Sequence, residues 1–163
     1  MVARFFRHLC SAYWQARRDF PDSARTAIAA AIARAEQGHA GEICFVVEAS
    51  LTPLQLLRGV SARERALQLF AQLHVWDTAA NSGVLVYVLL ADHAVEILAD
   101  RGLHPQGEVC WPRASERILQ AFRGGDPAPG CIDAVTEIGD FLRQAFPSDG
   151  ANPDELSNSV HLL

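Results

Sequence analysis

Residues 84–90 form an apolar run with no charged residue and no alternation of polar and apolar positions. Such a run predicts a central β-strand that is covered on both faces. It follows an apolar run at 43–48 and a helix that begins at a capping box, Ser61 to Glu64, and extends through His74. A strand, a helix and a strand of these lengths predict a βαβ unit with two parallel strands and a right-handed crossover.

Residues 94–99 predict a third strand that returns antiparallel through a tight hairpin, and its Glu96 indicates an edge position. In the helix of the βαβ unit, we expect Leu67, Phe70 and Ala71 to face the sheet. Helical spacing and helix-breaking residues predict further helices at 2–18, 24–37, 112–123 and 130–146. The predicted fold class is therefore α/β: a three-layer sandwich in which a small mixed sheet has helices on both faces.

The length of 163 residues, half of them hydrophobic, fits one domain with a substantial core. Pro21 separates the first helix from the rest, and Pro147 ends the last one. We expect an N-terminal amphipathic helix at 1–20, an α/β domain at 21–147 and a flexible or extended acidic tail at 148–163.

The charge balance restricts the possible partners and the location of the protein. The net charge is −5 and the basic residues, all arginine, form no stripe along the domain, which argues against a nucleic-acid partner. The four cysteines are scattered without a Cys-x-x-Cys pair, as is typical of a reduced cytoplasm. No apolar run approaches the roughly 20 residues of a membrane span, and the N-terminus lacks the apolar region of a signal peptide. We therefore expect a cytoplasmic protein.

The predicted N-terminal helix leaves open whether the protein also associates with a membrane. Its apolar residues follow helical spacing and its polar face carries four arginines and no acid. One interpretation is that the apolar stripe packs on the rest of the domain while the arginines are solvated, which is usual for a globular chain. The other is a weak contact with an anionic membrane surface, or with a partner protein. The apolar positions are Val2, Phe5, Phe6, Leu9, Tyr13 and Trp14.

The expected strand directions gather oxygen-bearing side chains at one end of the sheet. The first two strands begin at this end and the antiparallel third strand finishes there. Carboxylate, amide and hydroxyl oxygens suit Ca²⁺ or Mg²⁺ better than zinc or copper. The alternative is that these residues only cap turns, and that Asp100 pairs with an arginine such as Arg101. The candidate metal ligands are Asp77, Asn81, Asp100, Glu42 and Ser82.

Several segments together resemble the TPM-domain family, in particular its short, soluble bacterial branch. They are residues 41–48, 61–66, 75–78, 81–85, 100–103 and 152–156. The resemblance implies an α/β sandwich, and family members are labelled as phosphatases, as divalent-cation binders, notably of Ca²⁺, or as accessory factors. The family typically has an Asn-Asn-Gly-Val-Leu loop, and this chain has Ser82 in place of the second Asn. The family typically has an Asp-Arg turn, and this chain has Asp92-His93 there.

Two functional hypotheses from different classes follow. The first is a soluble binding or accessory protein that holds Ca²⁺ or Mg²⁺ at one end of the sheet and acts with protein partners at the membrane or envelope. The second is a metal-assisted acid phosphatase that uses Asp77 and Asp100, with Arg101 contacting the phosphate. The sequence contains no nucleophile elbow, Walker loop or His-Glu-x-x-His motif, so no catalytic residue is assigned.

Overall fold

A four-stranded mixed sheet forms the centre of the computed structural model, which describes residues 2–10, 13–103, 110–148 and 155–163. The strand order is β3-β2-β1-β4. β1 runs parallel to both β2 and β4, while β2 and β3 form an antiparallel hairpin. The strands are β1 (Glu42–Glu48), β2 (Gly83–Leu89), β3 (Ala94–Ala99) and β4 (His161–Leu162). The predicted parallel pair, the hairpin and the edge position of β3 are confirmed.

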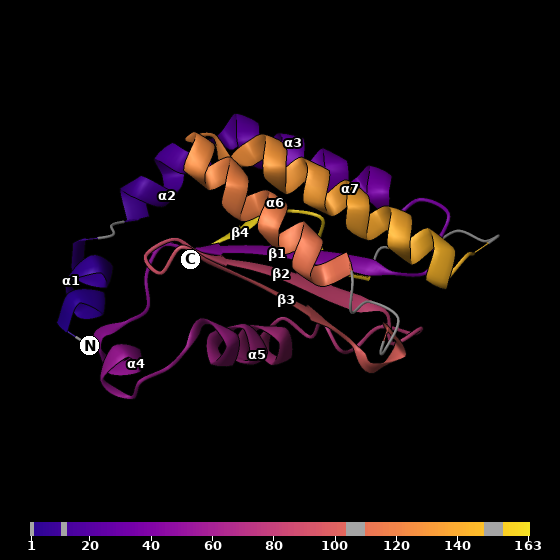
Figure 1. Cartoon of the computed structure of the whole chain (residues 1–163). Coiled ribbons are helices and arrows are strands. Elements are labelled where there is room, and N and C mark those ends of the chain that lie inside the picture. The colour runs from indigo at the N-terminus through magenta and orange to yellow at the C-terminus, as the bar shows by residue number, and fades with distance from the viewer. Residues whose placement is uncertain (1, 11–12, 104–109, 149–154) are drawn as a thin grey trace.

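Helices cover both faces of the sheet, as predicted for a three-layer sandwich (Figure 1). One layer contains α3 (Asp22–Ala35), α6 (Cys110–Gly124) and α7 (Pro127–Ala145). The other contains α4 (Pro53–Leu57) and α5 (Ala62–Gln72). Two short N-terminal helices, α1 (Val2–Cys10) and α2 (Tyr13–Asp19), lie at one end of the molecule, and a 3₁₀ turn, η1 (Arg101–Leu103), follows β3.

Side-chain alternation along the strands divides the core into two clusters. In β1, Ile43, Phe45 and Val47 pack with α3, α6 and α7, whereas Cys44 and Val46 pack with α5. All seven residues of β2 are buried, which confirms the central position predicted from its apolar run.

The prediction for the inner face of α5 is wrong in part. Ala66 and Leu69 are the buried residues of this helix, while Leu67 is 53% exposed and Ala71 is also exposed. Phe70 is partly buried. Arg65 of this helix reaches inward and donates to the buried carboxylate of Glu48 at 2.9 Å. This charged contact determines which side of α5 faces the sheet, and hydrophobic spacing does not reveal it.

The end of the chain contributes an edge strand that sequence patterns did not indicate. Leu163 N donates to Val47 O at 2.9 Å, and Ala49 N donates to Leu163 O at 3.0 Å. Val160, just before the strand, is buried in the larger core cluster. A strand of two residues, His161–Leu162, is too short for an alternation pattern to be recognised.

The described helices and three of the cysteines have properties that bear on membrane insertion and thiol reactivity. No helix in the described ranges has the length and apolarity that a transmembrane segment requires. Cys44, Cys110 and Cys131 are free and buried, and burial raises the pKa of Cys44 to about 12 and that of Cys110 to about 11. These thiols therefore stay protonated and act as small apolar residues.

Gly83 starts β2 in direct contact with the end of the crossover, and we predict that Gly83→Ala strongly destabilises the fold. A Cβ atom there would lie 1.9 Å from Val75 O, a backbone atom that no rotamer change can remove. Overpacking of this kind costs about 3 kcal/mol or more in the free energy of unfolding, measured by urea titration. Gly124→Ala, where nothing lies within 4 Å, is the matched control and should unfold like the natural protein. Equal stability of the two variants would contradict the packing described.

Candidate functional site

Two segments meet at the end of the sheet where β2 begins and β3 ends. They are the loop at 77–82 and the turn at 100–103, and we call the pair the rim. Asp100 N donates to Gly83 O at 2.9 Å, and Gly102 N donates to Asn81 O at 3.1 Å. These backbone bonds bring the loop that carries Asn81 beside the turn that carries Asp100.

The loop of the rim is built on a tight turn at Thr78. Asn81 N donates to the carbonyl oxygen of Thr78 at 3.0 Å, and Ser82 N donates to its Oγ1 at 3.0 Å. Asn81 itself has a φ of 50°, in the left-handed region that asparagine tolerates better than most residues. Thr78 therefore stabilises the turn, and it holds Asn81 at the surface of the rim.

Asp100 carries the unusual electrostatic feature of the rim. Its side chain is buried, with 8% of the residue exposed. One carboxylate oxygen, Oδ1, accepts a hydrogen bond from Arg101 N at 2.7 Å. The other, Oδ2, is buried and has no hydrogen-bond partner in the part of the chain that the structure describes. A buried carboxylate oxygen without a partner is costly, and such atoms are usually satisfied by an ordered water molecule, an ion or another ligand.

The side chain of Arg101 does not pair with Asp100. It is exposed, and its Nη2 donates instead to Asn81 Oδ1 at 3.3 Å. The two halves of the rim are thus joined by a side-chain contact as well as by the backbone. Asn81 Oδ1 therefore lies beside the positively charged guanidinium of an exposed side chain.

Glu42 and Ser82 are buried at the start of the two parallel strands and are engaged in structural contacts. Ser82 Oγ donates to Ala40 O at 2.6 Å. Glu42 is 1% exposed, and its Oε2 accepts a hydrogen bond from Leu156 N at 3.3 Å. Both side chains hold the neighbouring backbone in place at this end of the sheet.

Asp77 stands apart from the other candidates. Its side chain is exposed, and within the described ranges it makes no hydrogen bond or ion pair with any of them. Its backbone N–H donates to His74 O at 2.9 Å, which closes the turn after α5. The structure thus brings Asn81, Asp100 and Arg101 together, whereas Asp77 is exposed and takes no part in the hydrogen bonds that join them.

The C-terminal segment adds a residue to this region that no sequence motif indicated as part of the site. Glu155 Oε2 accepts a hydrogen bond from Ala79 N at 3.0 Å, so the segment is tied to the loop of the rim. The only signal in the sequence was the resemblance carried by residues 152–156. Hydrophobic periodicity gives no indication of such a contact, because it depends on tertiary structure.

Among the described residues, no group of three or more His, Cys, Asp and Glu side chains is arranged to hold a metal ion. The rim instead offers one buried carboxylate, an amide and backbone carbonyls. This donor set consists of oxygens, which fits a hard cation such as Ca²⁺ or Mg²⁺ and does not fit zinc.

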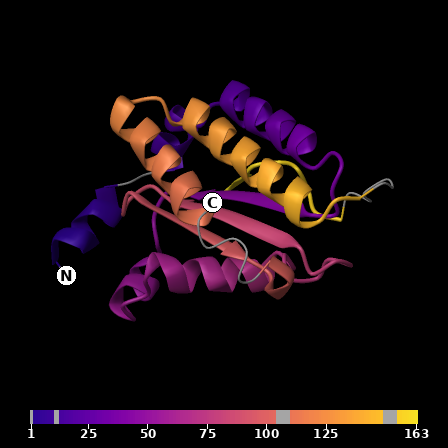
Figure 2. The same cartoon turned by 45° about the vertical axis from the view of Figure 1, so that its right-hand side comes forward.

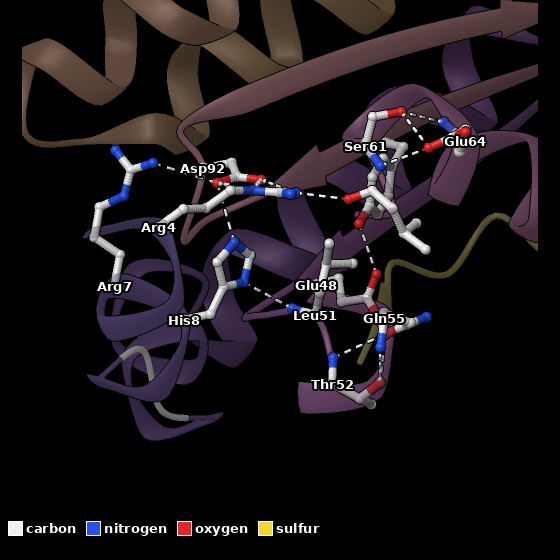
Figure 3. Close-up of polar contacts among 12 residues, drawn as sticks. Arg4, Arg7, His8, Glu48, Leu51, Thr52, Gln55, Ser61, Glu64 and Asp92 are labelled. Atoms are coloured by element: carbon white, nitrogen blue, oxygen red, sulfur yellow. Dashed lines mark hydrogen bonds and ion pairs between the residues drawn. The ribbon is translucent and has the colours of Figure 1, made fainter. Parts of the chain in front are cut away.

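A second polar cluster lies at the opposite end of the sheet, around Asp92 in the β2–β3 turn (Figure 3). Arg4 Nη2 donates to Asp92 Oδ2 at 2.8 Å, and its Nε is within 3.1 Å of both carboxylate oxygens. His8 Nδ1 accepts a hydrogen bond from Leu51 N at 2.9 Å, so the ring hydrogen lies on Nε2 and is donated to Asp92 Oδ1 at 3.0 Å. This cluster fixes α1 to the hairpin.

The model of the TPM domain matches residues 19–141, about three quarters of the sequence. The chain belongs to the TPM-domain family. It is similar to the NMR structure of the BA42 protein from the psychrophilic bacterium Bizionia argentinensis, with 27% identity, a TM-score of 0.75, and coverage of 86% of this chain and 93% of that chain. The comparison with curated proteins gave no match. All of α1, all of α2 except Asp19, and all of β4 lie outside the residues matched by the TPM domain.

The closeness of the two halves of the rim in this TPM domain can be tested with Gly102→Ala. A Cβ atom at this position would lie 2.4 Å from Asn81 O and 3.2 Å from Ala80 O. We expect the turn at 100–103 to move away from the loop, with a loss of about 1–3 kcal/mol in the free energy of unfolding. Amide NMR shifts should change mainly in the two rim segments. A variant with unchanged stability and unchanged shifts would show that the segments are not in contact.

The cluster around Asp92 predicts a specific dependence of stability on pH. Burial raises the pKa of Asp92, but the hydrogen bonds from Arg4 and His8 outweigh it and hold the pKa below its ordinary value. Because the folded pKa lies below the unfolded one, about 3.9, this stabilisation is complete at neutral pH and is lost as the pH falls through the folded pKa. Asp92→Asn should therefore lower the free energy of unfolding, measured by urea titration, by about 1–3 kcal/mol at pH 7. The difference from the natural protein should become progressively smaller below about pH 4. Asp133→Asn, at an exposed position of α7, should match the natural protein throughout. A constant penalty for Asp92→Asn at every pH would contradict this account.

Proposed function

We propose that this TPM-domain protein binds a divalent cation, Ca²⁺ or Mg²⁺, at the rim and acts as a binding or accessory protein. The observation that supports the proposal is the buried Oδ2 atom of Asp100, which lacks a hydrogen-bond partner among the described residues. A neighbouring cation would balance the negative charge of this oxygen and offset the free-energy cost of burying it.

Asp100 is the anchoring ligand in this proposal, and Asn81 provides a second oxygen. Asn81 Oδ1 now accepts a hydrogen bond from the Arg101 guanidinium at 3.3 Å. A divalent cation would repel this guanidinium, so Arg101 would turn toward solvent and release the amide oxygen. Both residues lie on segments held by backbone hydrogen bonds, which limits the reorganisation that binding requires.

The remaining candidates have supporting roles in the proposal. Ser82 and Glu42 are engaged with Ala40 O and Leu156 N, and they keep the strands that carry the rim in place. Asp77 is exposed on the adjoining loop and can add a negative charge that attracts the ion. Water molecules complete the coordination sphere of Ca²⁺ and Mg²⁺ in many protein sites.

In this proposal, a protein partner recognises the rim when the cation is bound. A cation bound between the two halves of the rim would order the loop at 77–82 and change the local charge by two units. Either effect alters the surface that a partner contacts. The metal-assisted phosphatase remains a prediction, since no described contact places a nucleophile or a free arginine beside Asp100.

Thermal unfolding with and without the ion tests the cation site. With free Ca²⁺ or Mg²⁺ about 100-fold above the dissociation constant, binding to the native state adds about 2.7 kcal/mol. This should raise Tm by about 5–10 °C over an EDTA-treated sample. Asp100→Asn should abolish the rise, yet be at least as stable as the natural protein in EDTA, because an amide there removes the buried charge.

Two further variants sharpen this experiment. Asp133→Asn has the same change of charge at an exposed position of α7 and should keep the full rise in Tm. Asp77→Asn should reduce the rise without abolishing it. If the natural protein shows no rise, or if Asp100→Asn shows the same rise, the rim does not bind the ion. Hydrolysis of p-nitrophenyl phosphate that disappears in Asp100→Asn would favour the phosphatase instead.

A further inference from the structure

The N-terminal helix α1 contacts the β2–β3 turn through two polar residues. Arg4 and His8, one turn apart, point to Asp92, and the side chain of His8 is fully buried (Figure 3). Phe6 and Leu9, on the opposite side of the helix, are 57% and 64% exposed. This is the reverse of the usual arrangement, in which the apolar stripe of an amphipathic helix packs on its own domain.

The exposed apolar residues of α1 lie at the same end of the molecule as those of α2 and α4. Of the eight large hydrophobic residues exposed in the described ranges, five lie on α1, α2 and α4. α1 and α4 are in contact, and Figures 1 and 2 show α1 extending from the body of the protein beside the end of the sheet. We call this set the apolar end surface. It consists of Phe6, Leu9, Trp14, Leu54 and Leu57.

The charges around the apolar end surface are mainly positive, and two of its arginines also form ion pairs: Arg7 with Asp92 at 3.5 Å and Arg18 with Asp19 at 2.8 Å. Exposed arginines come from the same elements or directly follow them, and the only acid on α1, α2 and α4 is the partly buried Asp19. The whole chain has a net charge of −5, so the positive charge at this end is a local feature. The exposed arginines are Arg7, Arg17, Arg18 and Arg58.

We propose that the apolar end surface binds the surface of an anionic lipid bilayer. Tryptophan, phenylalanine and leucine enter the boundary between headgroups and acyl chains, while arginines pair with anionic headgroups. A symmetric contact between two copies of the chain would place the same arginines against each other, so the charge favours an anionic partner. The proposal does not depend on the cation site, which lies at the other end of β3.

Vesicle flotation in the presence of EDTA tests the proposal without any contribution from a bound divalent cation. The natural protein should float with vesicles of equal parts phosphatidylcholine and phosphatidylglycerol, and remain unbound with phosphatidylcholine alone. The double variant Phe6→Ser, Leu9→Ser should lose binding, because it removes exposed apolar contacts and leaves Arg4 and His8 in place. Leu67→Ser, which changes a leucine that is 53% exposed on α5, is the matched control and should bind normally.

Charge and fluorescence give two independent readouts. The double variant Arg7→Gln, Arg58→Gln should weaken binding by about tenfold or more, and added salt should have a similar effect. Bound protein should show a blue shift of tryptophan emission that Trp14→Phe removes and that Trp76→Phe retains. Circular dichroism would confirm that all variants are folded.

Several outcomes would overturn the proposal. The natural protein could fail to bind anionic vesicles, or could bind neutral vesicles equally well. The serine double variant could bind as tightly as Leu67→Ser. A dimer detected by light scattering, lost in the serine double variant and accompanied by no vesicle binding, would show that a second copy of the chain covers this surface instead.

Discussion

The carboxylate of Glu48 at the end of β1 is the contact on which the arrangement of the βαβ unit depends. It is almost fully buried and accepts hydrogen bonds from Arg65 of α5, at 2.9 Å, and from the hydroxyl of Tyr87 of β2, at 2.6 Å. Burial, followed by the charge of Glu48, raises the pKa of Tyr87, so the hydroxyl remains a donor. Removing either partner would leave a poorly compensated buried charge, which is among the costliest defects in a core. One side chain thereby fixes the rotation of α5 and joins it to both parallel strands.

The two aspartates at the ends of β3 show how the same topology produces two different polar sites. At Asp92, both carboxylate oxygens accept hydrogen bonds from α1 side chains. At Asp100, one oxygen is satisfied by the backbone while the other is buried without a partner among the described residues. The first is a completed structural contact, which needs no ligand. The second is incomplete within this part of the chain, and this contrast is the physical reason for proposing the ion at Asp100.

The sequence predicted what local patterns encode and missed what depends on tertiary pairing. The apolar run at 84–90 and the capping box at Ser61 were sufficient to predict the parallel pair of strands and its crossover. The expected strand directions also predicted the end of the sheet at which Asn81 and Asp100 lie. The inner face of α5 was predicted wrongly because spacing cannot show that Arg65 pairs inside the protein. The strand His161–Leu162 was missed because two residues carry no period. Which oxygens of the rim are satisfied depends on atomic contacts, which no pattern encodes.

The orientation of α1 shows why amphipathicity alone does not determine which side of a helix is buried. A carboxylate at the turn before β3 pairs with Arg4 and His8, and this turns the apolar side outward. The turn and the rim are separated by the length of β3, roughly 20 Å at about 3.3 Å per residue. A protein bound to a bilayer through its apolar end surface would therefore hold the rim well away from the headgroups, open to the solution. Cation binding and membrane contact could then occur in the same molecule without steric conflict, and Asp92, which orients α1, would be the residue that links the TPM domain to the membrane.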